Sequence, residues 1–214
     1  TARLGTSADL SENFLNGVYS SAFDTRRELG SLQADLHVAS GLLTLGFDWL
    51  GDKVHSNTDY ERDRRINRGV FGQWQQTLGA QSLQASVRRD EDSQFGGETT
   101  GNVMWGWDVT DALRLGASYG TAFKAPTFNE LYFPGYGNPD LGPETSQSVE
   151  LSLRGEHGWG AWSLNAFETT IDDLIAFDSS LGDMGGPNNI DRARIRGVEA
   201  GAGVTWWDWN LRTS

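Results

Sequence analysis

Apolar and polar residues alternate one by one along most of this chain. In the segment 113–120 (LRLGASYG), for example, every second residue is apolar and the residues between are polar or glycine. Successive side chains of a β-strand point to opposite faces of the sheet, so this alternation predicts strands with one apolar face. About ten such segments follow one another, and a further one has barely started when the chain ends. The expected strands cover residues 2–10, 27–38, 43–49, 70–78, 83–87, 102–109, 113–123, 146–154, 162–166 and 192–204.

The connections between these segments alternate in length. Short turns are expected at 40–41, 79–80, 110–111, 156–160 and 206–210, and longer loops at 13–24, 52–63, 90–98, 124–143 and 179–189. Outer-membrane barrels have short periplasmic turns and longer extracellular loops. A soluble β-sandwich also has short strands, but it does not need a long loop at every second connection. The predicted fold is therefore all-β, a segment of a large antiparallel transmembrane β-barrel, with a β-sandwich as the alternative.

The composition agrees with a membrane barrel. Nine tryptophans and 27 glycines among 214 residues accompany a mean hydropathy of −0.47. Only every second strand residue of a barrel faces lipid, and aromatic residues gather at the two interfaces. Cysteine is absent, which excludes a disulfide framework, and a net charge of −12 without a basic stripe argues against a nucleic-acid partner. There is no apolar run of about 18 residues. No signal peptide is visible, so a processed or truncated chain is expected.

The face opposite the apolar stripe is polar in most predicted strands. It carries Gln33, Asp35, Thr44, Asp48, Gln73, Gln84, Arg88, Asn102, Asp108, Arg114, Glu150, Arg154, Asn165 and Glu199. This set is too polar for the packed interior of a small barrel. It fits a wetted lumen or a surface that meets a polar plug, and barrels of 22 strands are plugged transporters.

Three stretches resemble a known family. The sequences SYGTAFKAPTFNELY at 118–132, GNPDLGPETSQSVELSLRG at 137–155 and RIRGVEAGAG at 194–203 are similar to the barrel region of TonB-dependent outer-membrane receptors. The DLI segment at 173–175 and the spacing resemble the vitamin B12 (cobalamin) receptor branch. The similarity covers roughly residues 95–204.

The resemblance implies a fold and a function. Such receptors are 22-stranded outer-membrane barrels filled by an N-terminal plug domain, and an inner-membrane complex supplies energy through TonB. Residues 1–214 are then expected to be a partial barrel domain that lacks the plug and the C-terminal strands. The implied function is active uptake of a large scarce nutrient, cobalamin first and a ferric siderophore or haem as the alternative. Outer-membrane lipid is the expected surrounding, and neither an enzymatic activity nor a cofactor is expected.

The loop at 124–143 carries the candidate ligand-binding residues, which are Phe128, Tyr132, Phe133 and Tyr136. Apolar pockets with a few polar groups are typical of ligand sites, so these rings are candidates to stack on a large flat ligand. The alternative is that they belong to the interfacial aromatic belt or pack the loop on itself. Lys124, Asn129 and Glu130 are further candidates, with plain solvation as the alternative. The proline- and glycine-rich sequence predicts neither helix nor strand there.

Other charged clusters have two interpretations each. Residues 90–92 (DED) and the acids between 52 and 63 fit either a calcium site or solvated loop charge. The arginines at 62, 64, 65 and 68 fit either contacts to lipopolysaccharide phosphates or an anionic ligand, or solvation beside neighbouring acids. The three histidines are isolated, so no metal site is predicted. No G-x-S-x-G or H-E-x-x-H motif is present, so no catalytic residue is predicted.

A different class of function remains open in the sequence. In a soluble carbohydrate-binding module, tryptophans form a platform for sugars. Trp105 and Trp107 share their face with Val103 and Val109, which is the pattern of a lipid-facing stripe. Tryptophans that line a concave groove would contradict the barrel.

Overall fold

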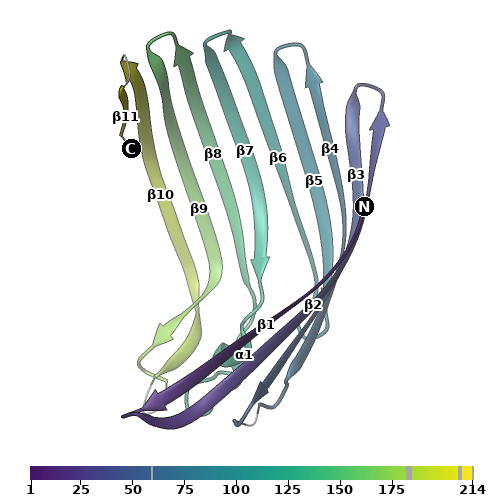
Figure 1. The fold of residues 1–214 in the computed structure, drawn as a ribbon, viewed down its shortest axis with the longest axis vertical. Helices are drawn as coiled ribbons and strands as arrows, with labels where there is room; N and C mark the ends of the chain where they lie inside the picture. Colours follow the sequence, from purple (N-terminus) through teal and green to yellow (C-terminus); the bar gives the residue numbers. More distant parts are fainter. Residues whose placement is uncertain (59, 182–184, 207–208, 214) are drawn as a thin grey trace.

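The computed structural model describes residues 1–58, 60–181, 185–206 and 209–213. Within these residues the chain forms one antiparallel sheet of eleven strands, in which each strand pairs with its neighbours in sequence (Figure 1). The elements are β1 Ala2–Leu15, β2 Val18–Val38, β3 Gly41–Ser56, β4 Arg64–Leu78, β5 Gln81–Asp92, β6 Gly96–Thr110, β7 Leu113–Lys124, α1 Phe128–Tyr132, β8 Glu144–His157, β9 Gly160–Asp178, β10 Gly186–Trp206 and β11 Trp209–Thr213. The predicted all-β antiparallel fold is confirmed.

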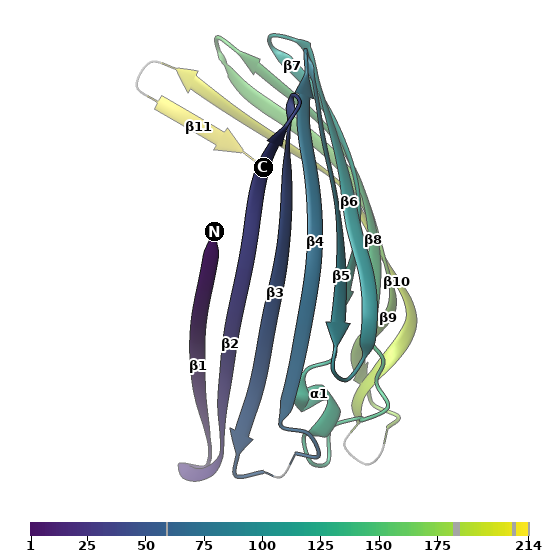
Figure 2. The same cartoon turned by 90° about the vertical axis from the view of Figure 1, so that its right-hand side faces the viewer.

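The sheet curves into an open trough with β1 and β11 at its two edges (Figure 2). The connections 57–63, 93–95, 125–143 and 179–185 gather at one end, which we call the long-loop end. The connections 39–40, 79–80, 111–112 and 158–159 gather at the other, the short-turn end. The helix α1 lies inside the trough at the long-loop end. No helix in the described part of the chain is long and apolar enough to cross a membrane.

The register sorts apolar side chains onto the outer, convex face. Leu115 of β7 lies opposite Leu153, which lies opposite Leu164, so the apolar row crosses three strands. Trp105 and Trp107 lie on this face too, because they pair with Ala117 and Leu115. Many large apolar residues of the outer face are exposed to the surroundings: Leu32, Leu36, Leu45, Phe47, Val70, Leu83, Val87, Val103, Trp107, Tyr119, Val149, Leu151, Leu164 and Val198. Tryptophans on the convex side are those of a lipid-facing stripe rather than of a sugar groove.

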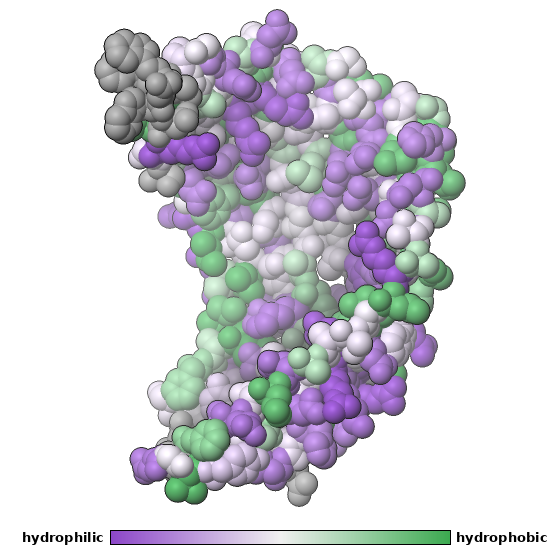
Figure 3. Space-filling model, in the orientation of Figure 1, coloured by the Kyte–Doolittle hydropathy of each residue, from purple (hydrophilic) through white to green (hydrophobic). Residues whose placement is uncertain are grey.

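The concave face is polar, as predicted. A hollow of about 840 Å³ lies on the half of this face nearer the short-turn end, lined among others by His37, Gln75, Gln84, Ser118 and Glu150. Figure 3 shows the hollowed centre, with hydrophilic residues covering much of the short-turn end. A soluble globule would bury its apolar face and expose its polar one, whereas this sheet has its apolar face outside. The arrangement is that of a barrel wall around a wet interior.

The loop predicted at 13–24 is wrong. β1 and β2 run on to a two-residue turn at Asn16-Gly17, whose φ angles are 52° and 81°. Two positive φ angles are the requirement of a type I′ hairpin, and Asn-Gly is its preferred sequence. The strands therefore continue as a two-stranded ribbon where the sequence had suggested an open loop.

Other predicted loops are shorter in the structure. The connection at 90–98 shrinks to 93–95, the one at 52–63 to 57–63, and the one at 179–189 to 179–185, of which 182–184 lie outside the described residues. The turn at 79–80 is confirmed, and most other turns are shifted by one residue. The predicted turn at 206–210 includes residues 207–208, which lie outside the described part. The strands exceed the predicted lengths because backbone pairing continues beyond the point where the apolar alternation stops.

Candidate ligand-binding site

The longest connection, residues 125–143, contains the helix α1, and the prediction that this loop holds no helix is wrong. Thr127 caps α1: its hydroxyl accepts a hydrogen bond from the Glu130 backbone N–H at 3.2 Å. The Glu130 carboxylate in turn accepts from the Thr127 N–H at 2.6 Å. This reciprocal pair is a capping box, which satisfies two backbone donors at the start of a helix. The signal that could have predicted this helix is the T-x-x-E spacing at 127–130.

Arg65 of β4 ties the loop to the wall of the trough. Its guanidinium lies 5.0 Å from the centre of the Phe128 ring and 5.8 Å from that of Phe95. It donates to the Pro126 carbonyl at 2.7 Å and lies 3.9 Å from the Asp92 carboxylate. The side chains of Arg65 and Asp92 are only 12% and 7% exposed. A cation between two aromatic faces, hydrogen-bonded and paired, is a strongly fixed group.

Further contacts attach the far side of the loop to β9 and β10. Asn189 donates to the Gly142 carbonyl at 3.1 Å and accepts from the Gly142 N–H at 2.8 Å. The Glu144 carboxylate accepts from Lys124 at 2.9 Å and from the Ile175 N–H at 3.0 Å. Leu131 is 1% exposed and belongs to the small apolar core that this end of the trough contains. The loop 125–143 is thus a packed platform rather than an unsupported surface loop.

Four aromatic rings meet beside this platform, and we call them the aromatic cluster: Phe23, Tyr60, Phe133 and Tyr136. Phe133 lies 5.9 Å from Phe23 and 6.5 Å from Tyr136, and Tyr60 lies 6.3 Å from Phe23, all between ring centres. The Tyr60 hydroxyl donates to Asn129 Oδ1 at 2.6 Å. Burial raises the pKa of Tyr60, so the phenol keeps its proton and remains a donor at neutral pH.

The four predicted ligand-binding residues lie in one region but in different environments. Phe128 is buried beneath Arg65. Tyr132 is half-buried and accepts a hydrogen bond from Gln94 at 2.7 Å. Phe133 is half-buried in the aromatic cluster, and Tyr136, 38% exposed, is the most open of the four. Phe133 and Tyr136 are therefore the two that a ligand approaching the cluster would meet.

Sequence reasoning missed Phe23 and Tyr60. Phe23 lay in a segment interpreted as an open loop, and Tyr60 is separated from Phe133 by about seventy residues. No periodicity links such positions; only the pairing of β2 with β3 and the fold of residues 125–143 bring them together. Lys124, Asn129 and Glu130, the other candidates, each have a partner within the chain, namely Glu144, Tyr60 and the Thr127 N–H.

The acidic run at 90–92 does not converge on one point. These residues end β5, so Glu91 points to the opposite face from Asp90 and Asp92. Asp90 pairs with Arg88 at 2.7 Å and Glu91 with Arg89 at 3.0 Å. Asp92 pairs with Arg65 and is nearly buried, so the interpretation as solvated loop charge is wrong for it. Among the described residues, no three His, Asp or Glu side chains are grouped closely enough to hold a metal ion.

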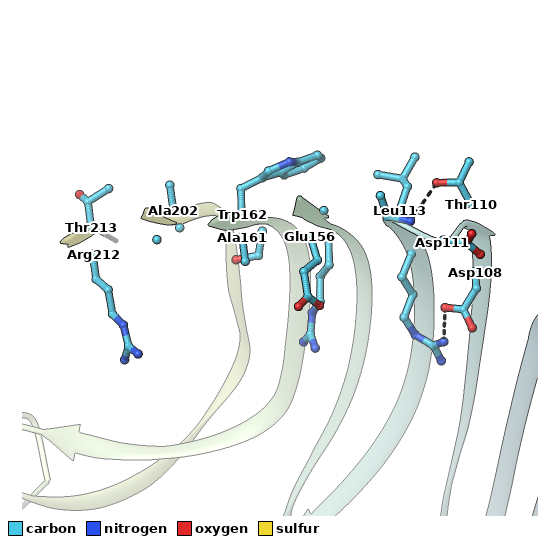
Figure 4. Close-up of a pocket in the computed structure, with 17 residues that line it drawn as sticks. Asp108, Thr110, Asp111, Leu113, Glu156, Ala161, Trp162, Ala202, Arg212 and Thr213 are labelled. Atoms are coloured by element: carbon cyan, nitrogen blue, oxygen red, sulfur yellow. Dashed lines mark hydrogen bonds and ion pairs between the residues drawn. The ribbon is translucent and has the colours of Figure 1, made fainter. Parts of the chain in front are cut away.

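A second hollow, of about 1140 Å³, lies at the short-turn end (Figure 4). Asp108, Glu156 and Arg212 point to one side of the sheet there, while Leu113 and Trp162 point to the other. Arg114 bonds to Asp108 at 2.6 Å and to the Ser82 hydroxyl at 2.6 Å. Charges of both signs thus line the polar wall at this end, far from the aromatic cluster.

Comparisons with known proteins agree on one family. The family model described as "TonB dependent receptor-like, beta-barrel" matches residues 2–214. Among curated proteins, the chain is 36% identical over 202 residues to the "Vitamin B12 transporter BtuB" of Photobacterium profundum, covering 91% of this chain and 33% of that protein. It is 33% identical to the protein of the same name from Vibrio vulnificus, covering 83% and 30%. The chain thus spans about a third of the length of these relatives.

Solved structures show the same fold. The siderophore receptor PirA from Pseudomonas aeruginosa superposes with a TM-score of 0.81 at 20% identity, over 99% of this chain and 44% of that one. The "Copper transporter OprC" gives a TM-score of 0.78 at 19% identity, over 97% and 40%. Together with the outward apolar face and the polar trough, these matches show that the chain belongs to the TonB-dependent receptor-like β-barrel family, a family of transport receptors rather than enzymes.

Proposed function

We propose that this chain is part of an outer-membrane receptor that takes up cobalamin in a TonB-dependent manner. The observation that carries the proposal is the 36% identity over 202 residues to a vitamin B12 transporter. The siderophore and copper proteins share the fold at 20% identity or less, so we infer nothing about the ligand of this chain from their names. Residues 1–214 supply part of the barrel wall; the plug domain, further strands and the contact with TonB belong to the rest of the receptor.

The aromatic cluster is the proposed contact with the ligand. A corrin ring is large and flat, and stacked or edge-on aromatic rings offer it a broad apolar surface. Phe133 and Tyr136 present that surface from a loop that Arg65, Asn189 and Glu144 hold in place. A platform that is already ordered loses little conformational entropy when a ligand binds.

The test is a titration of the full-length receptor in detergent with cyanocobalamin, in parallel with ferric siderophores and haem. Tyr136→Ala is expected to weaken cobalamin binding about tenfold, which is the loss of roughly 1.4 kcal/mol of contact. Tyr136→Phe keeps the ring and should bind almost as the natural protein does.

Trp159→Ala is the matched control, because Trp159 is an exposed aromatic residue in the turn at the opposite end of the trough. It should leave the affinity unchanged. If the receptor binds a siderophore or haem but not cyanocobalamin, its ligand belongs to the alternative class. If Tyr136→Ala and Trp159→Ala change the affinity equally, the aromatic cluster is not part of the ligand-binding site.

A further inference from the structure

A column of three arginines stands on the outer face of β10. Alternate residues of this strand point outward, and from the short-turn end these are Val204, Ala202, Ala200 and Val198, followed by Arg196, Arg194 and Arg192. The apolar part spans about 20 Å at 3.4 Å per residue. Strands of an outer-membrane barrel are tilted by about 35–45°, so this stretch covers about 15 Å of the barrel's height, and the arginines begin where the apolar residues of β10 end.

The column lies on the long-loop side of the apolar stripe. In barrels of this kind the long loops are extracellular, which places Arg192, Arg194 and Arg196 beside the headgroups of the outer leaflet. Arg192 pairs with Asp172 at 2.7 Å, and Arg194 lies 3.7 Å from Glu168. Among the described residues, Arg196 has no ion pair. Three cations against two carboxylates leave this patch positive on a chain whose net charge is −12.

An apolar groove lies next to Arg196, on its short-turn side. It has a volume of about 450 Å³, and its lining includes Leu151 of β8, Ala166 of β9 and Val198 of β10. Ala166 lies opposite both Leu151 and Val198, so its small side chain forms the floor between two larger neighbours. Glu168 and Arg196 line the groove as well. On a surface that faces lipid, the natural filling of such a groove is a hydrocarbon chain.

We propose that the outer face of β9 and β10 binds a phosphorylated, multiply acylated glycolipid of the outer leaflet. A phosphate lies against Arg194 and Arg196, whose planar guanidinium groups bind phosphate in a bidentate manner. An acyl chain occupies the groove over Ala166. The arginine column and the apolar floor are adjacent, which is the order of phosphate and acyl chain in such a lipid. The inference rests on the membrane placement in the proposed function but is independent of the nutrient that the receptor takes up.

The test measures lipid retention by the full-length receptor in detergent, by native mass spectrometry with bis-phosphorylated lipid A added. The double variant Arg194→Gln/Arg196→Gln is expected to weaken retention about 30-fold, since each arginine near an anionic lipid contributes roughly 1 kcal/mol. Glu168→Gln removes a competing carboxylate and should strengthen retention. Ala166→Leu fills the groove without changing charge and should weaken it.

Two comparisons make the test specific. Arg68→Gln is the matched control, because Arg68 stands on the outer face of β4 just beyond the apolar Val70 but is not part of the groove. It should retain lipid A as the natural protein does. Lipid A without phosphates and phosphatidylethanolamine should be retained weakly.

The proposal is overturned if the natural receptor retains no lipid A, if the double variant retains it fully, or if removing the phosphates has no effect. Cyanocobalamin titration of the same variants separates the two proposals. The lipid site is on the convex face and the aromatic cluster lies toward the concave one, so cobalamin affinity should be the same in every lipid-site variant. If the receptor retains lipid A through Arg194 and Arg196 but binds no cobalamin, the lipid site stands and the proposal of cobalamin as the ligand fails.

Discussion

At the scale of single residues, Arg65 decides how the long-loop end is arranged. It joins β4 to the loop 125–143 through two aromatic rings, a carbonyl and a nearly buried carboxylate. Arg65→Ala should make the loop open more easily by about 3 kcal/mol, because Asp92 is left buried without its cation. Hydrogen exchange of the backbone amides of residues 126–143 in the full-length receptor measures this.

Two variants of the same region sharpen that prediction. Arg65→Lys keeps the charge beside Asp92 but loses the flat stacking on Phe128, so an intermediate effect is expected. Arg64→Ala is the control, since Arg64 is exposed and points to the other face of β4. Exchange that is equally fast in Arg64→Ala and Arg65→Ala would show that the loop does not depend on the Arg65 contacts.

The sequence drew attention to part of this region, whose role in ligand binding stays a prediction. The candidates Phe128, Tyr132, Phe133 and Tyr136 were recognisable because they are concentrated in one unusual loop. Arg65 was one of four similar arginines, and only the strand register shows that it points inward while Arg64 points outward. Contacts between distant segments depend on the curvature of the sheet, which a two-residue pattern does not encode.

At the scale of elements, the hairpin of β1 and β2 depends on a backbone conformation. Gly17 has φ of +81° with open space where a Cβ would lie, whereas Gly158 has equally open space and no positive φ. Gly17→Ala should therefore destabilise its turn by about 1 kcal/mol, the cost of a left-handed conformation for an L-residue. Gly158→Ala should be nearly neutral. Denaturant unfolding of the full-length receptor in detergent compares them, and equal costs would contradict the type I′ geometry.

The strands themselves were well predicted at their centres and poorly at their ends. Within the apolar band, one face meets lipid and the alternation is sharp, as in residues 113–120. Beyond the band the regular alternation of apolar and polar residues is lost, so β2 begins at Val18 although its alternating pattern starts only near Arg27. Backbone hydrogen bonds between neighbouring strands hold these strand ends together, and a pattern of apolar residues does not predict backbone pairing.

At the scale of the whole molecule, the sheet has its apolar face outside and its polar face inside, the reverse of a soluble protein. Two adjacent residues of β6 test this arrangement directly. Val103 and Met104 are 47% and 48% exposed, but Val103 is on the outer face and Met104 lines the concave hollow. In a soluble protein, arginine at either position would be solvated with similar ease. In a barrel wall, Val103→Arg should cost about 2–4 kcal/mol, because the charge enters the lipid-facing band, and Met104→Arg should cost little in the wet lumen.

The measurement is the free energy of unfolding of the full-length receptor in lipid vesicles, together with the amount assembled in the outer membrane. The two residues match in exposure and are neighbours in one strand, and any difference in β-propensity between valine and methionine lies within a scale of about 1 kcal/mol, less than the expected loss at Val103. A large loss at Val103 alone means that the convex face meets lipid. Equal losses, or a larger loss at Met104, would mean that the convex face does not meet lipid, and the lipid site on β9 and β10 would fall with the barrel orientation.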